Sequence, residues 1–198
     1  MKLSRLFIFV LVICFLSAIS VSAQGLTAKG LKGGVSLAKF IGSDASIGTV
    51  DPSMAVKFAI GGFLNFEVSE QVSIRPEAYY SSKGSKYEEG GEELTFTMNY
   101  IDIPVLVVLK AGDNFGIFAG PQLGIYLNGE ITNEGSVDIE SDNVTSPAFD
   151  LVFGANYFFN QFHIDARYAM GISKTFDVTS DDDDVRHGVI QILFGIAL

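Results

Sequence analysis

The chain has 198 residues, about one domain's worth, and carries 23 acidic against 13 basic side chains, a net charge of −10. Nucleic acid is therefore not an expected partner, because binding to a phosphate backbone requires a basic surface. Yet 48% of the residues are hydrophobic, with 17 Phe and 7 Tyr among them. This proportion of hydrophobic residues is higher than is usual for a soluble acidic domain of this size.

The N-terminus predicts a signal peptide at residues 1–23. Lys2 and Arg5 give it a positive start, residues 6–16 (LFIFVLVICFL) form an apolar core, and Val21-Ser22-Ala23 forms a small-x-small cleavage site. The apolar core is shorter than the ~20 residues that a membrane-spanning helix needs, which argues against an uncleaved anchor. We therefore expect export and a mature domain at residues 24–198.

Cysteine usage narrows the chemistry further. Cys14 is the only cysteine and lies within the predicted signal peptide. The mature chain then has no thiol, which excludes disulfides, cysteine nucleophiles and thiolate metal sites. Loss of Lys2 and Arg5 would leave 11 basic and 23 acidic residues, a net charge of about −12.

In chain order, apolar residues at every second position predict eight strands, at about 28–41, 55–68, 72–83, 94–110, 115–129, 148–159, 162–173 and 186–198. Tight turns are expected at 69–71, 111–114 and 160–161. Long loops are expected at 42–54, 84–93, 130–147 and 174–185. An even number of strands with short turns at one end and long loops at the other is typical of a bacterial outer-membrane barrel.

We therefore predict an all-β fold, an eight-stranded antiparallel up-and-down transmembrane β-barrel. No mature segment reaches ~18 uninterrupted apolar residues, so membrane helices are not expected. A soluble lipocalin-like barrel or a β-sandwich would alternate similarly but would turn its apolar face inward. The mixed faces instead hold small residues such as Gly30, Gly34 and Gly120 beside isolated charges, as a narrow lumen filled by side chains requires.

Two local features are expected within this barrel. Pro104 cannot donate a ladder hydrogen bond, so we predict a bulge or kink there. Aromatic residues are expected to form two girdles at the membrane interfaces. The turn-side girdle would contain Phe66, Phe115, Phe159 and Phe162, and the loop-side girdle Phe40, Tyr80, Tyr126, Phe149 and Phe176.

Four ordered motifs carry a family resemblance. They are IRPEAYYSSKGSKY (74–87), NYIDIPVLVVLK (99–110), GIFAGPQLGIYL (116–127) and FDLVFGANYFFNQFHIDARYAMGISK (149–174). They resemble the successive motifs of the PorT-like outer-membrane β-barrel family of Bacteroidetes, over residues from about 25 to the C-terminus. The resemblance implies a barrel in the outer membrane of a Gram-negative bacterium and allows a link to protein secretion, but it implies no activity.

The last strand adds an expected biogenesis partner. Apolar residues occupy every second position back from Leu198, which resembles the C-terminal strand recognised by the barrel assembly machinery.

Charged residues on the inward faces form the best candidate site. Our interpretation is an ion-pair network that fills the lumen, made of Arg75, Glu77, Asp102, Asp150, His163, Asp165 and Arg167. A path for ions or protons is the alternative. No catalytic residue is expected, since the chain has neither a G-x-S-x-G elbow nor a metal-binding pair of histidines. A lipid-acting enzyme using His187 with Ser173 or Ser180 ranks lower.

The predicted long loops hold 16 of the 23 acidic residues, which solvation alone can explain. A sharper hypothesis is that their carboxylates bind Ca²⁺ or Mg²⁺ weakly and bridge to phosphates of outer-membrane lipid or lipopolysaccharide. The weak metal candidates are Asp181, Asp182, Asp183 and Asp184; no cofactor is otherwise expected.

We thus expect a monomeric, non-enzymatic structural or interaction component of the envelope, with periplasmic termini, extracellular acidic loops and an envelope protein as a partner to be found. A small conductance barrel for ions or solutes is the alternative.

Overall fold

The computed structural model describes residues 25–176 and 184–198, so the predicted signal peptide lies outside the described residues. Every regular element in the described part is a strand except one short 3-10 helix. In chain order they are β1 (Leu26–Ile41), β2 (Ala55–Glu67), β3 (Val72–Glu89), β4 (Glu92–Lys110), β5 (Phe115–Thr132), β6 (Ser136–Asp138), η1 (Ser141–Asn143), β7 (Ala148–Phe159), β8 (Phe162–Gly171) and β9 (Arg186–Ala197). None of the described residues forms a helix long and apolar enough to cross a membrane.

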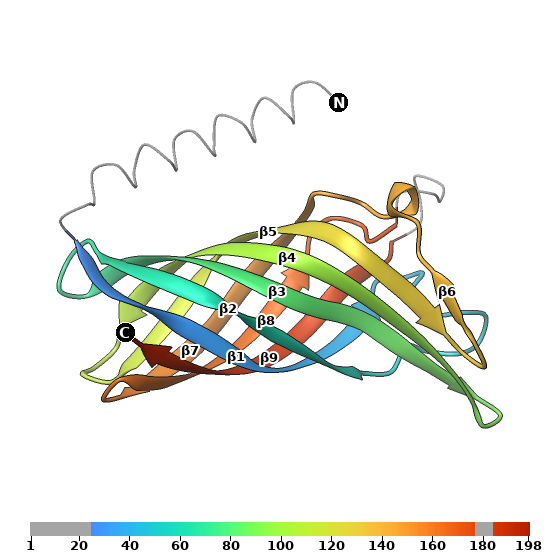
Figure 1. The fold of residues 1–198 in the computed structure, drawn as a ribbon, viewed down its shortest axis with the longest axis horizontal. Coiled ribbons are helices and arrows are strands. Elements are labelled where there is room, and N and C mark those ends of the chain that lie inside the picture. The colour runs from blue at the N-terminus through green and yellow to red at the C-terminus, as the bar shows by residue number, and fades with distance from the viewer. Residues whose placement is uncertain (1–24, 177–183) are drawn as a thin grey trace, which may run out of the picture.

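Eight of the strands close into a ring (Figure 1). Each pairs antiparallel with its neighbours along the chain, and pairing of β1 with β9 closes the barrel. β6 lies outside the ring as a short addition to β5. The predicted eight-stranded up-and-down barrel is therefore confirmed.

The connections differ at the two ends of the barrel, which we call the turn end and the loop end. The β2–β3, β4–β5 and β7–β8 turns are short, and Asn160 takes a positive φ of 57° in the last of them. Both chain termini of the barrel also lie at the turn end (Figure 1). The β1–β2, β5–β7 and β8–β9 connections form the loop end.

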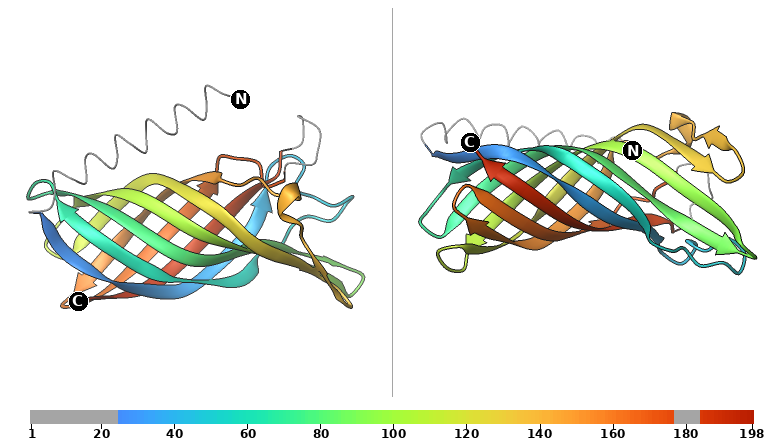
Figure 2. Two further views of the ribbon diagram at one scale, coloured as in Figure 1. Left: turned by 45° about the horizontal axis from the view of Figure 1, so that its top comes forward. Right: turned by 60° about the horizontal axis from the view of Figure 1, so that its bottom comes forward.

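One predicted loop is wrong. Residues 84–93 are not a long loop, because β3 and β4 stay paired as far as Glu89 and Glu92. Gly90 and Gly91 make the tight turn with φ of 62° and 95°, values that glycine adopts without steric cost. This β3–β4 hairpin projects beyond the ring at the loop end, next to the β5–β6 hairpin (Figure 2).

A bulge or a kink was expected at Pro104. The bulge is wrong, because the register shift lies between Asn99 and Tyr100, and the kink stays a prediction. Pro104 stays paired with Gln122 of β5, while its pairing to β3 is interrupted between the Pro76–Val105 and Tyr79–Asp102 pairs. The missing donor is thus absorbed by a gap in one ladder, without an extra residue.

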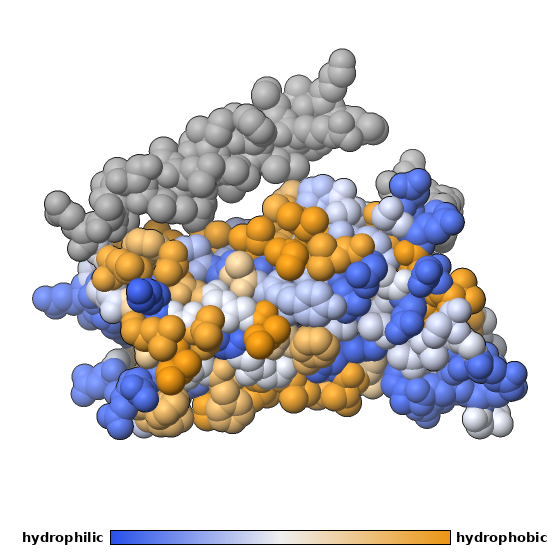
Figure 3. Space-filling model, in the orientation of Figure 1, coloured by the Kyte–Doolittle hydropathy of each residue, from blue (hydrophilic) through white to orange (hydrophobic). Residues whose placement is uncertain are grey.

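The outer wall of the barrel is apolar. Large apolar side chains at alternate positions of the strands are exposed, including Phe58 at 52% and Ile60 at 59% of their surface. An apolar band crosses the middle of the molecule, with hydrophilic residues gathered toward both ends (Figure 3). Such a band is what the hydrocarbon core of a bilayer requires.

The predicted aromatic girdles are only half right. At the turn end Phe115, Phe159 and Phe162 are exposed as predicted. At the loop end Phe40 and Tyr126 are buried, because they lie on the inward phase of β1 and β5.

Candidate functional site

Five charged side chains meet inside the turn-end half of the barrel. We call Lys32, Arg75, Glu77, Asp165 and Arg167 the turn-side cluster; all five are buried. Lys32 Nζ lies 2.7 Å from Glu77 Oε1 and 2.6 Å from Asp165 Oδ2. Arg167 donates Nη1 to Glu77 Oε2 at 2.7 Å and Nη2 to Asp165 Oδ2 at 2.8 Å.

Arg75 completes the cluster less tightly. Its Nε lies 3.0 Å from Glu77 Oε1 and its Nη2 lies 3.6 Å from Asp165 Oδ2, but neither atom makes a well-directed hydrogen bond to a described residue. The guanidinium groups of Arg75 and Arg167 also lie over the ring of Phe118, at 4.8 and 5.4 Å from its centroid. Three cations therefore face two carboxylates, and an aromatic face receives part of the excess positive charge.

A second group lies nearer the loop end. In this loop-side cluster, Lys83 Nζ is 2.9 Å from both Asp102 Oδ1 and Asp150 Oδ2. Gln122 donates its amide to Asp150 Oδ2 at 2.6 Å. Here one cation faces two carboxylates, and the neutral amide supplies the missing donor.

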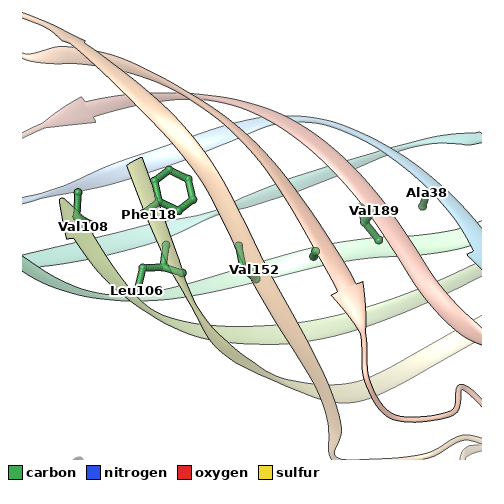
Figure 4. Close-up of a cluster of buried hydrophobic side chains, with 7 residues drawn as sticks. Ala38, Leu106, Val108, Phe118, Val152 and Val189 are labelled. Carbon is green, nitrogen blue, oxygen red and sulfur yellow. The ribbon is translucent and has the colours of Figure 1, made fainter. Parts of the chain in front are cut away.

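The structure therefore divides the predicted charged set between two clusters. Glu77 and Lys83 both lie on β3, six residues apart, which corresponds to roughly 20 Å along a strand. Buried apolar side chains, among them Leu106, Phe118 and Val152, line the inner wall across several strands (Figure 4). No ion pair joins the two clusters among the residues that the structure describes.

Two lysines of these clusters were not assigned to the predicted network. Lys32 lies within the predicted strand 28–41, and Lys83 is the last residue of the predicted strand 72–83. Both share the inward phase of the charged residues on their neighbours, so strand phase was a sufficient signal. Their ion-pair partners are 19 to 133 residues away in the chain. Asp102 lies on the strand next to Lys83, whereas the more distant partners follow only from closure of the ring.

The two histidines are both buried in the interior. The His163 ring stacks on Phe158 at 4.9 Å and meets Phe63 edge-on at 5.1 Å. Its Nε2 is 4.0 Å from Asp165 Oδ1. The His163 ring therefore lies beside the turn-side cluster but makes no hydrogen bond to it.

The rim arrangement imagined for a lipid-acting enzyme is not seen in the described residues. His187 is 4% exposed and lies against Tyr100, whose hydroxyl is 3.3 Å from Nε2. Ser173 Oγ accepts a hydrogen bond from the Phe149 amide at 3.0 Å. Ser180 lies outside the described residues.

Aromatic and aliphatic side chains close the lumen at the loop end. This loop-end cap is formed by Phe40, Ala45, Tyr87, Met98, Tyr100, Tyr126 and Val144. Residues of the loops are held onto it by hydrogen bonds, from the Tyr87 hydroxyl to the Ala45 carbonyl at 2.5 Å and from the Tyr126 hydroxyl to the Ile139 carbonyl at 2.8 Å. Phe176, predicted in a membrane girdle, also packs against this cap.

The loops are tied to one another at the surface. Asp44 Oδ2 accepts the Ser43 hydroxyl at 2.6 Å and the Asp184 amide at 2.8 Å, and these hydrogen bonds lower the pKa of the Asp44 carboxyl. On the projecting hairpin, Lys86 Nζ lies 2.5 Å from Glu93 Oε2, which raises the pKa of Lys86 and lowers that of Glu93.

The acidic metal candidates give a partial picture. Asp181, Asp182 and Asp183 lie outside the described residues. Asp184 accepts a hydrogen bond from Arg186 Nε at 2.5 Å. No group of three potential metal ligands comes together within the described ranges.

The closed ring, the apolar outer wall and the charged interior define a transmembrane β-barrel protein. Residues 22–177 match the outer membrane protein β-barrel domain family, and the chain belongs to that family.

Solved structures with a similar fold include two outer-membrane proteins. Ail, the attachment invasion locus protein of Yersinia pestis, matches with a TM-score of 0.52 and 15% identity over 86% of this chain and 98% of Ail. The Neisserial surface protein A matches with a TM-score of 0.56 and 13% identity over 85% of this chain and 96% of that protein. At these identities the likeness extends to the fold. No curated protein sequence gives a significant match.

Proposed function

We propose that this protein is a non-enzymatic structural or interaction component of the outer membrane, in which the barrel serves as a rigid anchor for its loop-end surface. The observation that carries the proposal is the filled lumen. Two buried ion clusters, an apolar inner wall and the loop-end cap occupy the interior along its length. An eight-stranded barrel is only wide enough for side chains, so these groups leave no continuous water path.

The proposed orientation follows the asymmetry of the two ends. Short turns and termini face the periplasm, and the long connections face outward, as in bacterial barrels generally. The β3–β4 and β5–β6 hairpins then project from the cell surface and carry exposed carboxylates, including Glu89, Glu92 and Glu134.

This charge suggests which partners the surface suits. A basic region of an envelope or secretion protein would be attracted, whereas an anionic lipid headgroup would need a bridging divalent cation. One solved structure of Ail holds a heparin analogue, sucrose octasulfate. The acidic hairpins of this chain favour a basic partner. If they serve in attachment, they would bind a basic surface rather than a sulfated ligand.

The finer assignment to a PorT-like group, with a role in secretion or envelope assembly, is supported by the four sequence motifs alone. Insertion by the barrel assembly machinery as a monomer is part of the same proposal. The second candidate function, passage of ions or small solutes, is favoured only by the charges inside the lumen.

Planar-bilayer recording of the purified protein tests the proposal. We expect no steady unitary conductance, and we expect Arg167→Ala to remain silent as well. Reproducible single-channel steps in the wild type that change selectivity in Arg167→Ala would overturn the anchor proposal and make the clusters a pore lining.

A further inference from the structure

The turn end of the lumen contains a cavity of about 240 Å³. We call it the vestibule. Phe63, Val108 and Phe158 give its walls an apolar part. Polar and charged residues complete the lining, among them Asp113 and the ion pair of Lys110 with Glu67. Arg75 and Asn156 also line it and are 1% and 2% exposed, so they lie at its inner end.

Asn156 is the unexplained residue of this cavity. It lies on β7 between Gly116 of β5 and Asp165 of β8. Neither its Oδ1 nor its Nδ2 makes a hydrogen bond to any described residue. A buried amide without partners costs free energy, so a native site of this kind normally holds something that satisfies it.

The backbone opposite Asn156 leaves room for this side chain. A Cβ atom at Gly116 would lie 2.6 Å from Asn156 Oδ1, too close for contact. The glycine therefore allows the amide to lie over β5 within the vestibule. The amide group therefore lies against the wall of the vestibule, with its nitrogen and oxygen buried.

The neighbouring charge favours an anion. Arg75 presents Nε and Nη2 without well-directed hydrogen bonds, and the cluster behind it holds three cations against two carboxylates. One added negative charge would balance this cluster. Phenyl rings around the same space suit an aliphatic group, while the volume equals that of roughly eight water molecules at ~30 Å³ each.

We propose that the vestibule binds one short aliphatic carboxylate. Its carboxylate accepts hydrogen bonds from Arg75 and from Nδ2 of Asn156, and its alkyl group packs against Phe63 and Phe158. With the turn end in the periplasm, the ligand is a small solute of that compartment. The site is independent of the anchor role, since the loop-end cap blocks the route through the lumen in either case.

Propionate is a suitable probe of this site. The mature barrel, labelled with ¹⁵N in detergent micelles, is titrated with sodium propionate replacing sodium chloride at constant ionic strength. We expect saturable shifts of the Asn156 side-chain amide and of the Arg75 Nε–H resonance, and no such shifts with propionamide, the neutral analogue. Shifts that stay linear, or that propionamide reproduces, would mean that the vestibule holds only water and would overturn the proposal.

Matched variants locate the binding. Asn156→Leu removes the amide with little change of volume and should weaken propionate binding at least roughly tenfold, as expected for a lost hydrogen bond to a charged group. Gln191→Met removes another buried amide of the lumen, which donates to Ser36 Oγ at 3.0 Å outside the vestibule, and should leave binding unchanged. Equal binding by wild type and Asn156→Leu would also refute the site. If Asn156→Leu does not fold, Gly116→Ala displaces the same amide and is expected to weaken binding.

Discussion

Lys83→Met should be among the most destabilising single substitutions in the barrel. Lys83 is the only cation within ion-pair distance of Asp102 and Asp150 among the described residues, and the three side chains are at most 4% exposed. Removing it leaves two buried carboxylates facing each other, and stranding a buried charge costs about 3–5 kcal/mol. Methionine keeps most of the volume, so the loss reports charge rather than a cavity.

The comparison with Arg167→Met makes this reasoning sharper. That substitution leaves Lys32 and Arg75 against Glu77 and Asp165, a balanced set, so its cost should be smaller than that of Lys83→Met. Adding Asp150→Asn to Lys83→Met removes one of the two stranded charges and should recover part of the loss.

The assay is urea unfolding of the barrel in lipid vesicles, followed by the mobility difference between folded and unfolded bands on a gel. Lys86→Met is the control, because Lys86 makes exposed ion pairs that are worth at most about 1 kcal/mol. Equal stability of Lys83→Met and Lys86→Met would refute the view that the lumen charges are buried and mutually satisfied.

Three further predictions concern the wall, the topology and the loops. Ile60→Arg places a charge on the exposed apolar wall and should cost about 2–4 kcal/mol and impair assembly, whereas Ser136→Arg on β6 should be tolerated; equal folded yields would mean that this wall does not meet lipid. A tag inserted between Gly90 and Gly91 should be labelled on intact cells and a tag at Asn160 should not, and the reverse pattern would invert the orientation. The pKa of the Asp44 carboxyl is lowered in the folded protein, so its hydrogen bonds contribute fully to the stability of the β1–β2 loop above the unfolded pKa of about 4. That contribution is lost as pH falls through the lower folded pKa. Proteolysis of the loop should therefore increase in acid for the wild type, whereas Asp44→Asn should lack this pH dependence.

The alternation of apolar and polar residues was sufficient to predict the barrel. Successive side chains point alternately to lipid and to the lumen in every strand of the wall. The same alternation also indicates which aromatic residues face the lumen, but the aromatic residue type alone suggested a membrane girdle. Phe40 and Tyr126 are aromatic and lie near the loop end, which suggested a girdle, yet each shares the inward phase of its strand. Phase, rather than residue type, decides which side of the wall a residue faces.

The β3–β4 hairpin shows a limit of the same approach. Glu88, Glu89, Glu92 and Glu93 suggested a solvated loop, since acidic runs have low strand propensity. The two strands nevertheless continue in register, because Gly90-Gly91 closes a tight turn and the ladder already begun in the membrane extends outward. Once a hairpin register is fixed, extending it adds hydrogen bonds without a new loop to close.

Cross-barrel partners could not be predicted at all from local pattern. Asp165 of β8 meets Lys32 of β1 and Arg75 of β3 inside the barrel, and those contacts depend on strand tilt and on the offset with which the ring closes. The sequence predicted which charges point inward, but the division into two clusters is a property of the closed ring.

That division explains how a narrow lumen holds four cations and four carboxylates. The set balances as a whole, yet the turn-side cluster has one excess cation and the loop-side cluster one excess carboxylate. The two clusters are too far apart for the excess charge of one to neutralise that of the other. The excess charge of each cluster therefore has to be stabilised by groups beside it. The Phe118 face supplies it to the arginines and the Gln122 amide supplies it to Asp150. Neutral groups therefore offset part of the excess charge in each cluster, which is the arrangement expected of a packed barrel interior rather than of a route for ions.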